Sequence, residues 1–133
     1  MALQYGVNLR NAKQNAITTQ LGATSTLKLF SGAEAANCAA ADPSGLLATL
    51  TLPNPMFGSS SSGTLPLTGT WSNNASGSGT AASFRIYDSS AVCQIQGSCS
   101  AGGGGGDMIL SSTTITSGLA FTVTAFNLTA GNV

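Results

Sequence analysis

Hydrophobic and polar residues alternate most clearly within residues 82–97. The alternation runs through Phe84, Arg85, Ile86 and Tyr87. A two-residue period is typical of a strand with one buried face, here the face of Phe84 and Ile86. Residues 88–91 predict a short polar turn, and residues 92–96 can return as the second strand of an antiparallel hairpin. Because a hairpin cannot bury its hydrophobic face by itself, other strands must cover this one.

A helix is predicted over residues 8–21, where small and hydrophobic residues recur at helical spacing. These residues are Leu9, Ala12, Ala16, Ile17 and either Gln20 or Leu21. Asn8 is placed to cap the first turn, and Gly22 is placed to end the helix in a left-handed conformation. The hydrophobic stripe is thin, so we expect a helix that lies on a sheet edge or an arm that docks on a neighbouring subunit.

Other segments carry the pattern of strands, namely residues 26–30, 46–52, 65–71, 108–115 and 119–128. Segments rich in Gly, Ser, Pro or Ala lie between them and predict loops at residues 34–44, 58–63, 72–80 and 102–106. The Ser-rich loop 58–63 and the five consecutive glycines at 102–106 are expected to be flexible. Ala125 is expected to face inward. At Phe126 the hydrophobic positions switch to the opposite face of the strand, which predicts either a bulge or a strand covered on both faces.

Many short strands separated by turn residues, with no alternation of strands and helices, predict an all-β fold. We expect an antiparallel β-sandwich or jelly roll with a short N-terminal helix or arm. Residues 1–25 would form the N-terminal arm or helix, and residues 26–133 would form the β-sandwich domain. The 133 residues suffice for one such domain with its own core.

Charged side chains are scarce. Four basic and four acidic residues make up 6% of the chain, against about 25% in typical soluble domains. Without a basic excess we expect no nucleic-acid binding. We also expect no membrane association, because the sequence has no long hydrophobic run, no charge cluster and no segment that resembles a signal peptide. The neutral surface predicts a protein that is covered by neighbours in an assembly.

The sequence contains no histidine, which removes the most common general base and the Ser-His-Asp triad. The carboxylates are Glu34, Asp42, Asp88 and Asp107. Their positions beside small and turn-forming residues predict roles in turns and loops. The pentaglycine lacks the Lys-Ser/Thr of a phosphate-binding loop, and no metal-ligand spacing is present. We therefore expect no enzymatic activity, no cofactor and no metal.

Three cysteines, Cys38, Cys93 and Cys99, form an odd set. In a protein made in the cytoplasm they are expected to be reduced thiols. The alternative is a disulfide bridge between Cys93 and Cys99, across the end of the second strand of the hairpin.

Large aromatic and hydrophobic residues are the candidates for a contact surface. The candidate interface residues are Tyr5, Leu9, Phe30, Trp71 and Tyr87. Trp71 and Tyr87 could instead stack on a sugar ring, but large aromatic residues on strand faces more often anchor a core or an interface.

Several stretches carry a resemblance to a known group of proteins. They are Y-G-V-N-L-R-N-A at residues 5–12, L-K-L-F-S-G at 27–32, C-A-A-A-D at 38–42, L-L-A-T-L-T-L-P at 46–53, G-T-W at 69–71, F-R-I-Y-D at 84–88 and L-T-A-G-N at 128–132. In these stretches the chain resembles small virion proteins of tailed bacteriophages that act as capsid cement or decoration proteins. The resemblance spans most of the chain, but none of the stretches is a mechanistic motif, and no functional residue is carried over.

The resemblance implies a structural protein, located on the capsid surface of the virion after synthesis in the host cytoplasm. Its partners would be the major capsid protein and further copies of itself, in a homodimer or homotrimer formed through sheet edges and the N-terminal segment. It would bridge and stabilise the capsid subunits. The alternative function is a tail or head-fibre module that binds host-surface glycan through Trp71, Tyr87 and the polar loops.

Overall fold

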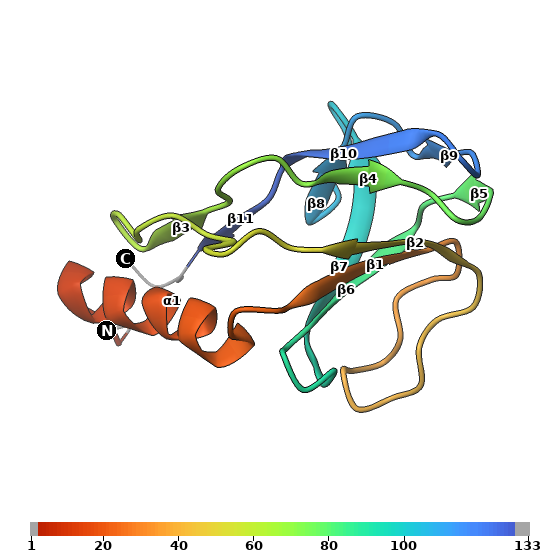
Figure 1. Cartoon of the computed structure of the whole chain (residues 1–133). Coiled ribbons are helices and arrows are strands. Elements are labelled where there is room, and N and C mark those ends of the chain that lie inside the picture. Colours follow the sequence, from red (N-terminus) through yellow and green to blue (C-terminus); the bar gives the residue numbers. More distant parts are fainter. Residues whose placement is uncertain (1–2, 130–133) are drawn as a thin grey trace.

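The computed structural model describes residues 3–129 and confirms the all-β class with a short N-terminal helix (Figure 1). The elements are α1 (Val7–Leu21), β1 (Thr26–Phe30), β2 (Leu46–Thr51), β3 (Thr64–Pro66), β4 (Ser72–Asn74), β5 (Gly79–Thr80), β6 (Ser83–Tyr87), β7 (Cys93–Ala101), β8 (Met108–Leu110), β9 (Thr114–Ile115), β10 (Ala120–Ala125) and β11 (Asn127–Thr129). In this part of the chain no helix is long and apolar enough to cross a membrane. Two short strands, β4 and β5, lie in the segment that was predicted to be one loop.

Seven strands form one nearly closed sheet in the order β2-β1-β6-β7-β8-β10-β4. Strands β7 and β8 run parallel and the other neighbours run antiparallel, so the sheet is mixed. The outer strand β2 bonds to β4 through Asn73 Nδ2, which donates to Thr49 O, and to the segment after β4 through Ser76 N and Gly77 N, which donate to Leu47 O. Two ribbons, β11-β3 and β5-β9, complete the fold. The edges of the large sheet therefore bond to each other.

The predicted hairpin is confirmed and lies in the middle of this sheet, where β6 pairs with both β1 and β7. Phe84 and Ile86 point into the core, as the alternation predicts. All five residues of β6 are nevertheless buried, including Arg85 at 2% and Tyr87 at 7% exposure. The outer face of β6 is therefore covered as well.

Four aromatic rings form a cluster within the core. Its members are Phe57, Trp71, Phe84 and Phe126, with ring centroids 5.2 to 6.2 Å apart in the contacting pairs. Phe126 enters this cluster because the register of β10 shifts between Val123 and Ala125. The predicted change of parity is confirmed as a bulge, and Ala125, which was expected to face inward, is exposed.

Helix α1 packs against β3 with a face that matches the predicted one only at its C-terminal end, where Ile17 and Leu21 contact the core. Its buried residues are Arg10, Gln14 and Leu21. Leu9 is exposed, and Asn8 lies inside the helix, which begins after Gly6 without a side-chain cap. Gly22 ends the helix as predicted, with φ at 79° and its N–H donated to Thr18 O.

Polar contacts with the serine-rich loop 58–63 determine which face of the helix is docked. Asn11 Oδ1 accepts hydrogen bonds from Gly63 N and Ser60 Oγ, and Gln14 Nε2 donates to Gly63 O. The loop is therefore fastened to the helix, whereas the sequence predicted a flexible segment. Leu21 belongs to the same core as the strands, so the helix is docked on the β-domain and does not extend away as an arm.

The five glycines form a tight connection between the parallel strands β7 and β8. Gly104 N donates to Ala101 O, and Gly106 N donates to Ser100 Oγ. A Cβ atom at Gly106 would lie 2.7 Å from both the carbonyl carbon of Cys99 and the backbone nitrogen of Ser100. At Gly106 the connection therefore lies so close to the backbone of β7 that it leaves no room for a side chain.

Candidate functional site

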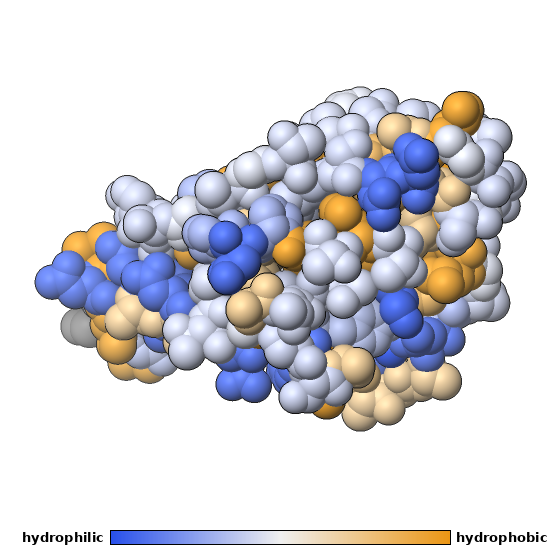
Figure 2. All heavy atoms as spheres, viewed as in Figure 1, coloured by the Kyte–Doolittle hydropathy of each residue, from blue (hydrophilic) through white to orange (hydrophobic). Residues whose placement is uncertain are grey.

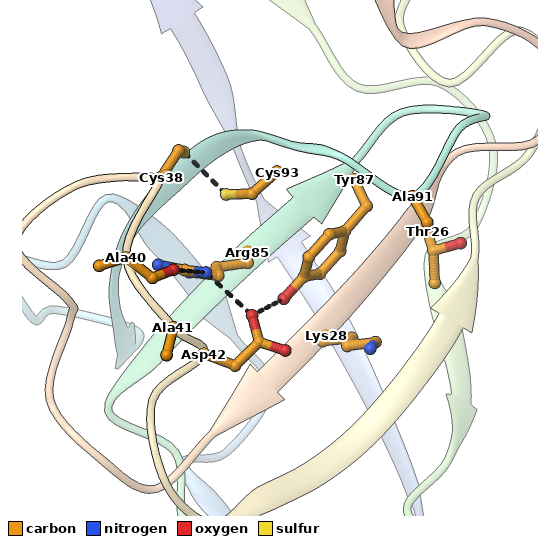
Figure 3. Close-up of a pocket in the computed structure, with 10 residues that line it drawn as sticks. All are labelled: Thr26, Lys28, Cys38, Ala40, Ala41, Asp42, Arg85, Tyr87, Ala91 and Cys93. Atoms are coloured by element: carbon orange, nitrogen blue, oxygen red, sulfur yellow. Dashed lines mark hydrogen bonds and ion pairs between the residues drawn. The ribbon is translucent and has the colours of Figure 1, made fainter.

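A surface pocket of about 510 Å³ lies over the outer face of β6, beneath the long loop between β1 and β2. We call this loop, residues 31–45, the covering loop. Figure 3 shows the pocket residues, which come from β1, β6, β7, the β6–β7 turn and the covering loop. They are Thr26, Lys28, Cys38, Ala40, Ala41, Asp42, Arg85, Tyr87, Ala91 and Cys93.

Strand pairing places the polar residues of β1 and β6 on the same outer face. Lys28 is opposite Arg85, and Thr26 is opposite Tyr87. Residues that face each other across a strand pair share one side of the sheet. Lys28 Nζ lies 4.9 Å from the centre of the Tyr87 ring, which is within the range of a cation–π contact.

A bulge in β7 adds Cys93 to this face. Ile86 pairs with Ile95 and Tyr87 pairs with Cys93, so Gln94 is an extra residue between the two pairs. Ile95 packs against the core. Without the extra residue, Cys93 would share the inward face of Ile95, and with it Cys93 lies beside Tyr87 on the outer face.

Arg85 fastens the covering loop to the sheet. Its Nη1 donates to Ala40 O at 3.0 Å and to Asp42 Oδ1 at 2.9 Å, and its Nη2 donates to Asn37 O at 3.0 Å. Its Nε has no hydrogen-bond partner among residues 3–129. The guanidinium therefore replaces most of its lost hydration with groups of the loop, which is the condition for burying an arginine.

A hydrogen bond between Tyr87 and Asp42 is the second contact that holds the covering loop on the sheet. Tyr87 Oη donates to Asp42 Oδ1 at 2.5 Å. This hydrogen bond, with smaller contributions from Arg85 and Lys28, holds the pKa of Asp42 below its usual value, although partial burial opposes the shift. Burial and the neighbouring carboxylate both raise the pKa of Tyr87. At neutral pH the pair is therefore an ionised carboxylate and a protonated phenol.

The remaining pair in the pocket is Cys38 and Cys93, whose sulfur atoms lie 2.7 Å apart. Burial, and next the neighbouring Cys38, raise the pKa of Cys93 to about 12. The third cysteine, Cys99, packs against the core on the other side of the sheet, and burial raises its pKa to about 12. The structure therefore does not support the alternative of a bridge between Cys93 and Cys99, because the two side chains face opposite sides.

Comparison of the chain with protein-family models, with curated proteins and with solved structures gives no match. The pocket must therefore be interpreted from its own chemistry.

The candidate interface residues do not form one surface. Phe30 and Trp71 are 2% and 0% exposed and belong to the interior, so the structure contradicts an exposed contact role for either residue. Tyr87 is buried under the covering loop, where its hydroxyl group is bonded to Asp42. Tyr5 is half-buried beneath Lys13, whose Nζ lies 4.3 Å from the ring centre. Of the five, Leu9 is the exposed residue, at 51%.

This distribution also bears on the proposed glycan site. Of the two aromatic residues expected to stack on a sugar, Trp71 is 0% exposed, and Tyr87, in the wall of the pocket, is 7% exposed. A stacking site needs an accessible ring face. A glycan site on this chain would therefore need residues other than these two.

The predicted turn and loop roles of the carboxylates agree with the structure. Asp88 Oδ1 accepts hydrogen bonds from Ser90 N and Val92 N in the hairpin turn. Asp107 Oδ2 accepts hydrogen bonds from the backbone and hydroxyl of Ser98. The sequence pattern does not connect Asp42 with Arg85, because the alternation places Arg85 on the face of the strand that is expected to be exposed, where an arginine needs no buried partner.

Proposed function

We propose that this chain is a non-enzymatic structural protein of a bacteriophage head, a cement protein that binds neighbouring major capsid subunits. The pocket over β6 supports the proposal that the chain is not an enzyme, because the polar side chains there form hydrogen bonds with one another. Arg85 and Tyr87 both donate to the same oxygen of Asp42. Such an arrangement fastens a loop and leaves these groups few free bonds for a substrate.

The pKa shifts in the pocket support the same interpretation. A catalytic base needs a carboxylate pKa raised toward neutrality, and a nucleophile needs a lowered thiol or phenol pKa. Here the pKa of Asp42 is lowered, and those of Tyr87 and Cys93 are raised. At neutral pH Asp42 is therefore an ionised carboxylate of low basicity, and Tyr87 and Cys93 are protonated and so weak nucleophiles.

The low surface charge supports association with other protein surfaces. Arg10, Arg85 and Asp88 are buried, which leaves five of the eight charged side chains at the surface of a 133-residue chain. Figure 2 shows strongly hydrophilic residues as small separate clusters on a surface that is mostly of intermediate hydropathy. A surface with so little charge resists self-association and adhesion only weakly. Such a surface suits a protein that is covered by neighbours.

The contact is expected to use side chains near the N-terminal helix. The edges of the large sheet bond to each other, so pairing through β2 or β4 would break hydrogen bonds that already exist. Of the six large exposed hydrophobic residues in the described part of the chain, Leu3, Val7 and Leu9 lie in its first nine residues, whereas Leu46, Val92 and Leu119 are spread over the rest. We therefore place both the capsid contact and the contact between copies of this chain, in a dimer or trimer, on this part of the surface.

The test is a comparison of purified phage heads assembled with and without the protein. We expect it to occupy the outer surface in a copy number set by the icosahedral symmetry of the shell, and heads without it to open at a lower temperature. Its absence from particles, or heads of equal stability without it, would contradict the proposal.

Two exposed leucines give matched variants for the contact surface. Leu9→Asp should reduce occupancy on the head, because a charge then enters the proposed contact. Leu119→Asp should leave occupancy unchanged, because Leu119 is also exposed, at 62%, but lies in the turn before β10. Equal loss in both variants would contradict the placement of the contact on the helix.

A further inference from the structure

We propose that Cys38 and Cys93 form an intramolecular disulfide when the protein meets a small disulfide oxidant such as oxidised glutathione, and that the bridge locks the covering loop onto the sheet. The inference goes beyond the proposed function and does not depend on it. It identifies a covalent modification site on the outer face of the hairpin.

The distance between the two sulfur atoms is the first observation. Cys38 Sγ and Cys93 Sγ lie 2.7 Å apart, and a disulfide bond measures about 2.05 Å. The two thiols therefore need to move by only a fraction of an ångström to bond. Figure 3 shows the two side chains pointing toward each other across the end of the pocket.

The backbone holds Cys38 in this position from both sides. Asn37 Oδ1 accepts hydrogen bonds from Ala39 N and Ala40 N, which folds a tight turn around the cysteine. Arg85 then binds the carbonyl groups of Asn37 and Ala40. One buried side chain thus anchors the residues before and after Cys38, so closing the bridge needs little ordering of the loop.

Cys93 is held equally well. The Gln94 bulge turns it to the outer face, and the preceding turn is fixed by Asp88, which binds Ser90 N, Val92 N and Gln94 Nε2. Cys99 cannot compete for the same partner, because it packs against the core on the opposite side of the sheet. The proposed bridge therefore has one possible pairing within the chain.

The reaction is ordinary thiol–disulfide exchange. Cys38 loses its proton and attacks one sulfur of oxidised glutathione, which breaks the S–S bond of the oxidant and releases one glutathione thiolate. Cys93 then gives its proton to that thiolate and attacks Cys38 Sγ, which releases the second glutathione as a thiolate that takes up the proton from Cys38. The two protein thiols lose two electrons, and one oxidised glutathione becomes two reduced molecules. The half-buried state of both cysteines leaves the pocket as the route for the oxidant.

The test uses the full chain, first reduced and then incubated with oxidised glutathione. After denaturation and alkylation with iodoacetamide, mass spectrometry should find one alkylated cysteine, Cys99, and a peptide link between residues 38 and 93. The reduced sample should carry three alkylated cysteines. Three alkylated cysteines after oxidation, a lasting glutathione adduct, a link that includes Cys99, or a disulfide-linked dimer would each overturn the proposal.

Thermal unfolding provides a second measurement. Closing a loop this long should raise the unfolding midpoint of the oxidised protein by about 5 °C or more. Cys99→Ala is the matched control and should keep both the link and the rise in midpoint. Cys38→Ala should lose both. No difference between the oxidised and reduced wild-type protein would overturn the claim that the bridge locks the covering loop.

Discussion

Tyr87 Oη donates a 2.5 Å hydrogen bond to Asp42 Oδ1, a carboxylate oxygen 45 residues earlier in the chain. The same oxygen accepts a second hydrogen bond from Arg85 Nη1. One atom of the covering loop therefore joins two neighbouring side chains of β6. This contact explains why a strand whose sequence predicts one buried face has both faces buried.

Removing Asp42 and removing Arg85, the two partners of the ion pair, should lower the free energy of unfolding by different amounts. Asp42→Ala leaves the buried Arg85 guanidinium without its counter-charge and should lower the free energy of unfolding by about 2 kcal/mol, less than for a fully buried pair because the Asp42 side chain is 41% exposed. Arg85→Met leaves Asp42 open to water and should cost about 1 kcal/mol. The measurement is urea unfolding of both variants.

The double variant and a hydroxyl deletion complete this comparison. Asp42→Ala combined with Arg85→Met should cost less than the sum of the two single changes, because no unpaired charge remains. Tyr87→Phe should cost about 1 kcal/mol, since it removes only the hydroxyl group. Simple additivity would show that the ion pair contributes nothing to the fastening of the loop.

Acid should lower the free energy of unfolding, because Asp42 and Asp88 become protonated. The hydrogen bond from Tyr87 lowers the pKa of Asp42, and the hydrogen bond from the Val92 backbone is the main cause of the lowered pKa of Asp88. A carboxylate whose pKa is lower in the folded state stabilises that state above its unfolded pKa, and this contribution is lost as the pH falls through the folded pKa. We therefore expect stability to fall as the pH drops below the usual value of 3.8.

Carboxyl-carbon NMR titration measures these two groups directly. Tyr87→Phe should raise the pKa of Asp42 and leave that of Asp88 unchanged, because Asp88 is bonded within its own turn. A wild-type pKa of 3.8 or higher for Asp42 would contradict the hydrogen-bonded arrangement.

Adjacent glycines in the β7–β8 connection should respond differently to substitution. Gly106→Ala forces a Cβ against the backbone of Cys99 and Ser100 and should cost roughly 1–3 kcal/mol. At Gly105 an added Cβ meets nothing within 4 Å, so Gly105→Ala should be neutral or stabilising by up to about 1 kcal/mol. Thermal unfolding compares the two, and equal effects would be inconsistent with the close parallel approach of β7 and β8.

Trp71 should behave as a core residue and not as a contact residue. Trp71→Ala removes a side chain that is 0% exposed and touches Phe57 and Phe126, so it should cost about 3–5 kcal/mol. Leu119→Ala, at an exposed position, should change stability by less than about 0.5 kcal/mol. A stable Trp71→Ala protein that had lost only a binding activity would contradict the burial of the indole ring.

Local patterns predicted the elements that depend on local interactions. The two-residue period found the β6–β7 hairpin, and Gly22 marked the helix end, because both signals lie within a few residues of the structure they specify. The change of parity at Phe126 likewise predicted the bulge in β10. These features need no knowledge of the rest of the chain.

The site depends on contacts between distant segments, and local patterns could not supply them. The covering loop has no hydrophobic period, so nothing indicated that it would lie over β6 and bind Arg85. The Gln94 bulge reverses the face of Cys93, which a regular alternation assigns to the core. The docked face of α1 follows from polar contacts of Asn11 and Gln14, which a search for a hydrophobic stripe does not detect.

Amide hydrogen exchange of the covering loop tests most directly the claim that Arg85 fastens it to the sheet. In the wild-type protein, Ala39 N and Ala40 N should exchange roughly 100-fold slower than in an unfolded chain, because both donate to Asn37 Oδ1 in a held turn. Arg85→Met should remove the protection of these two amides. In the same variant Gly32 N, which donates to Ser44 O at the base of the loop, should stay protected. Exchange of Ala39 and Ala40 at the unfolded rate in the wild-type protein would contradict the account.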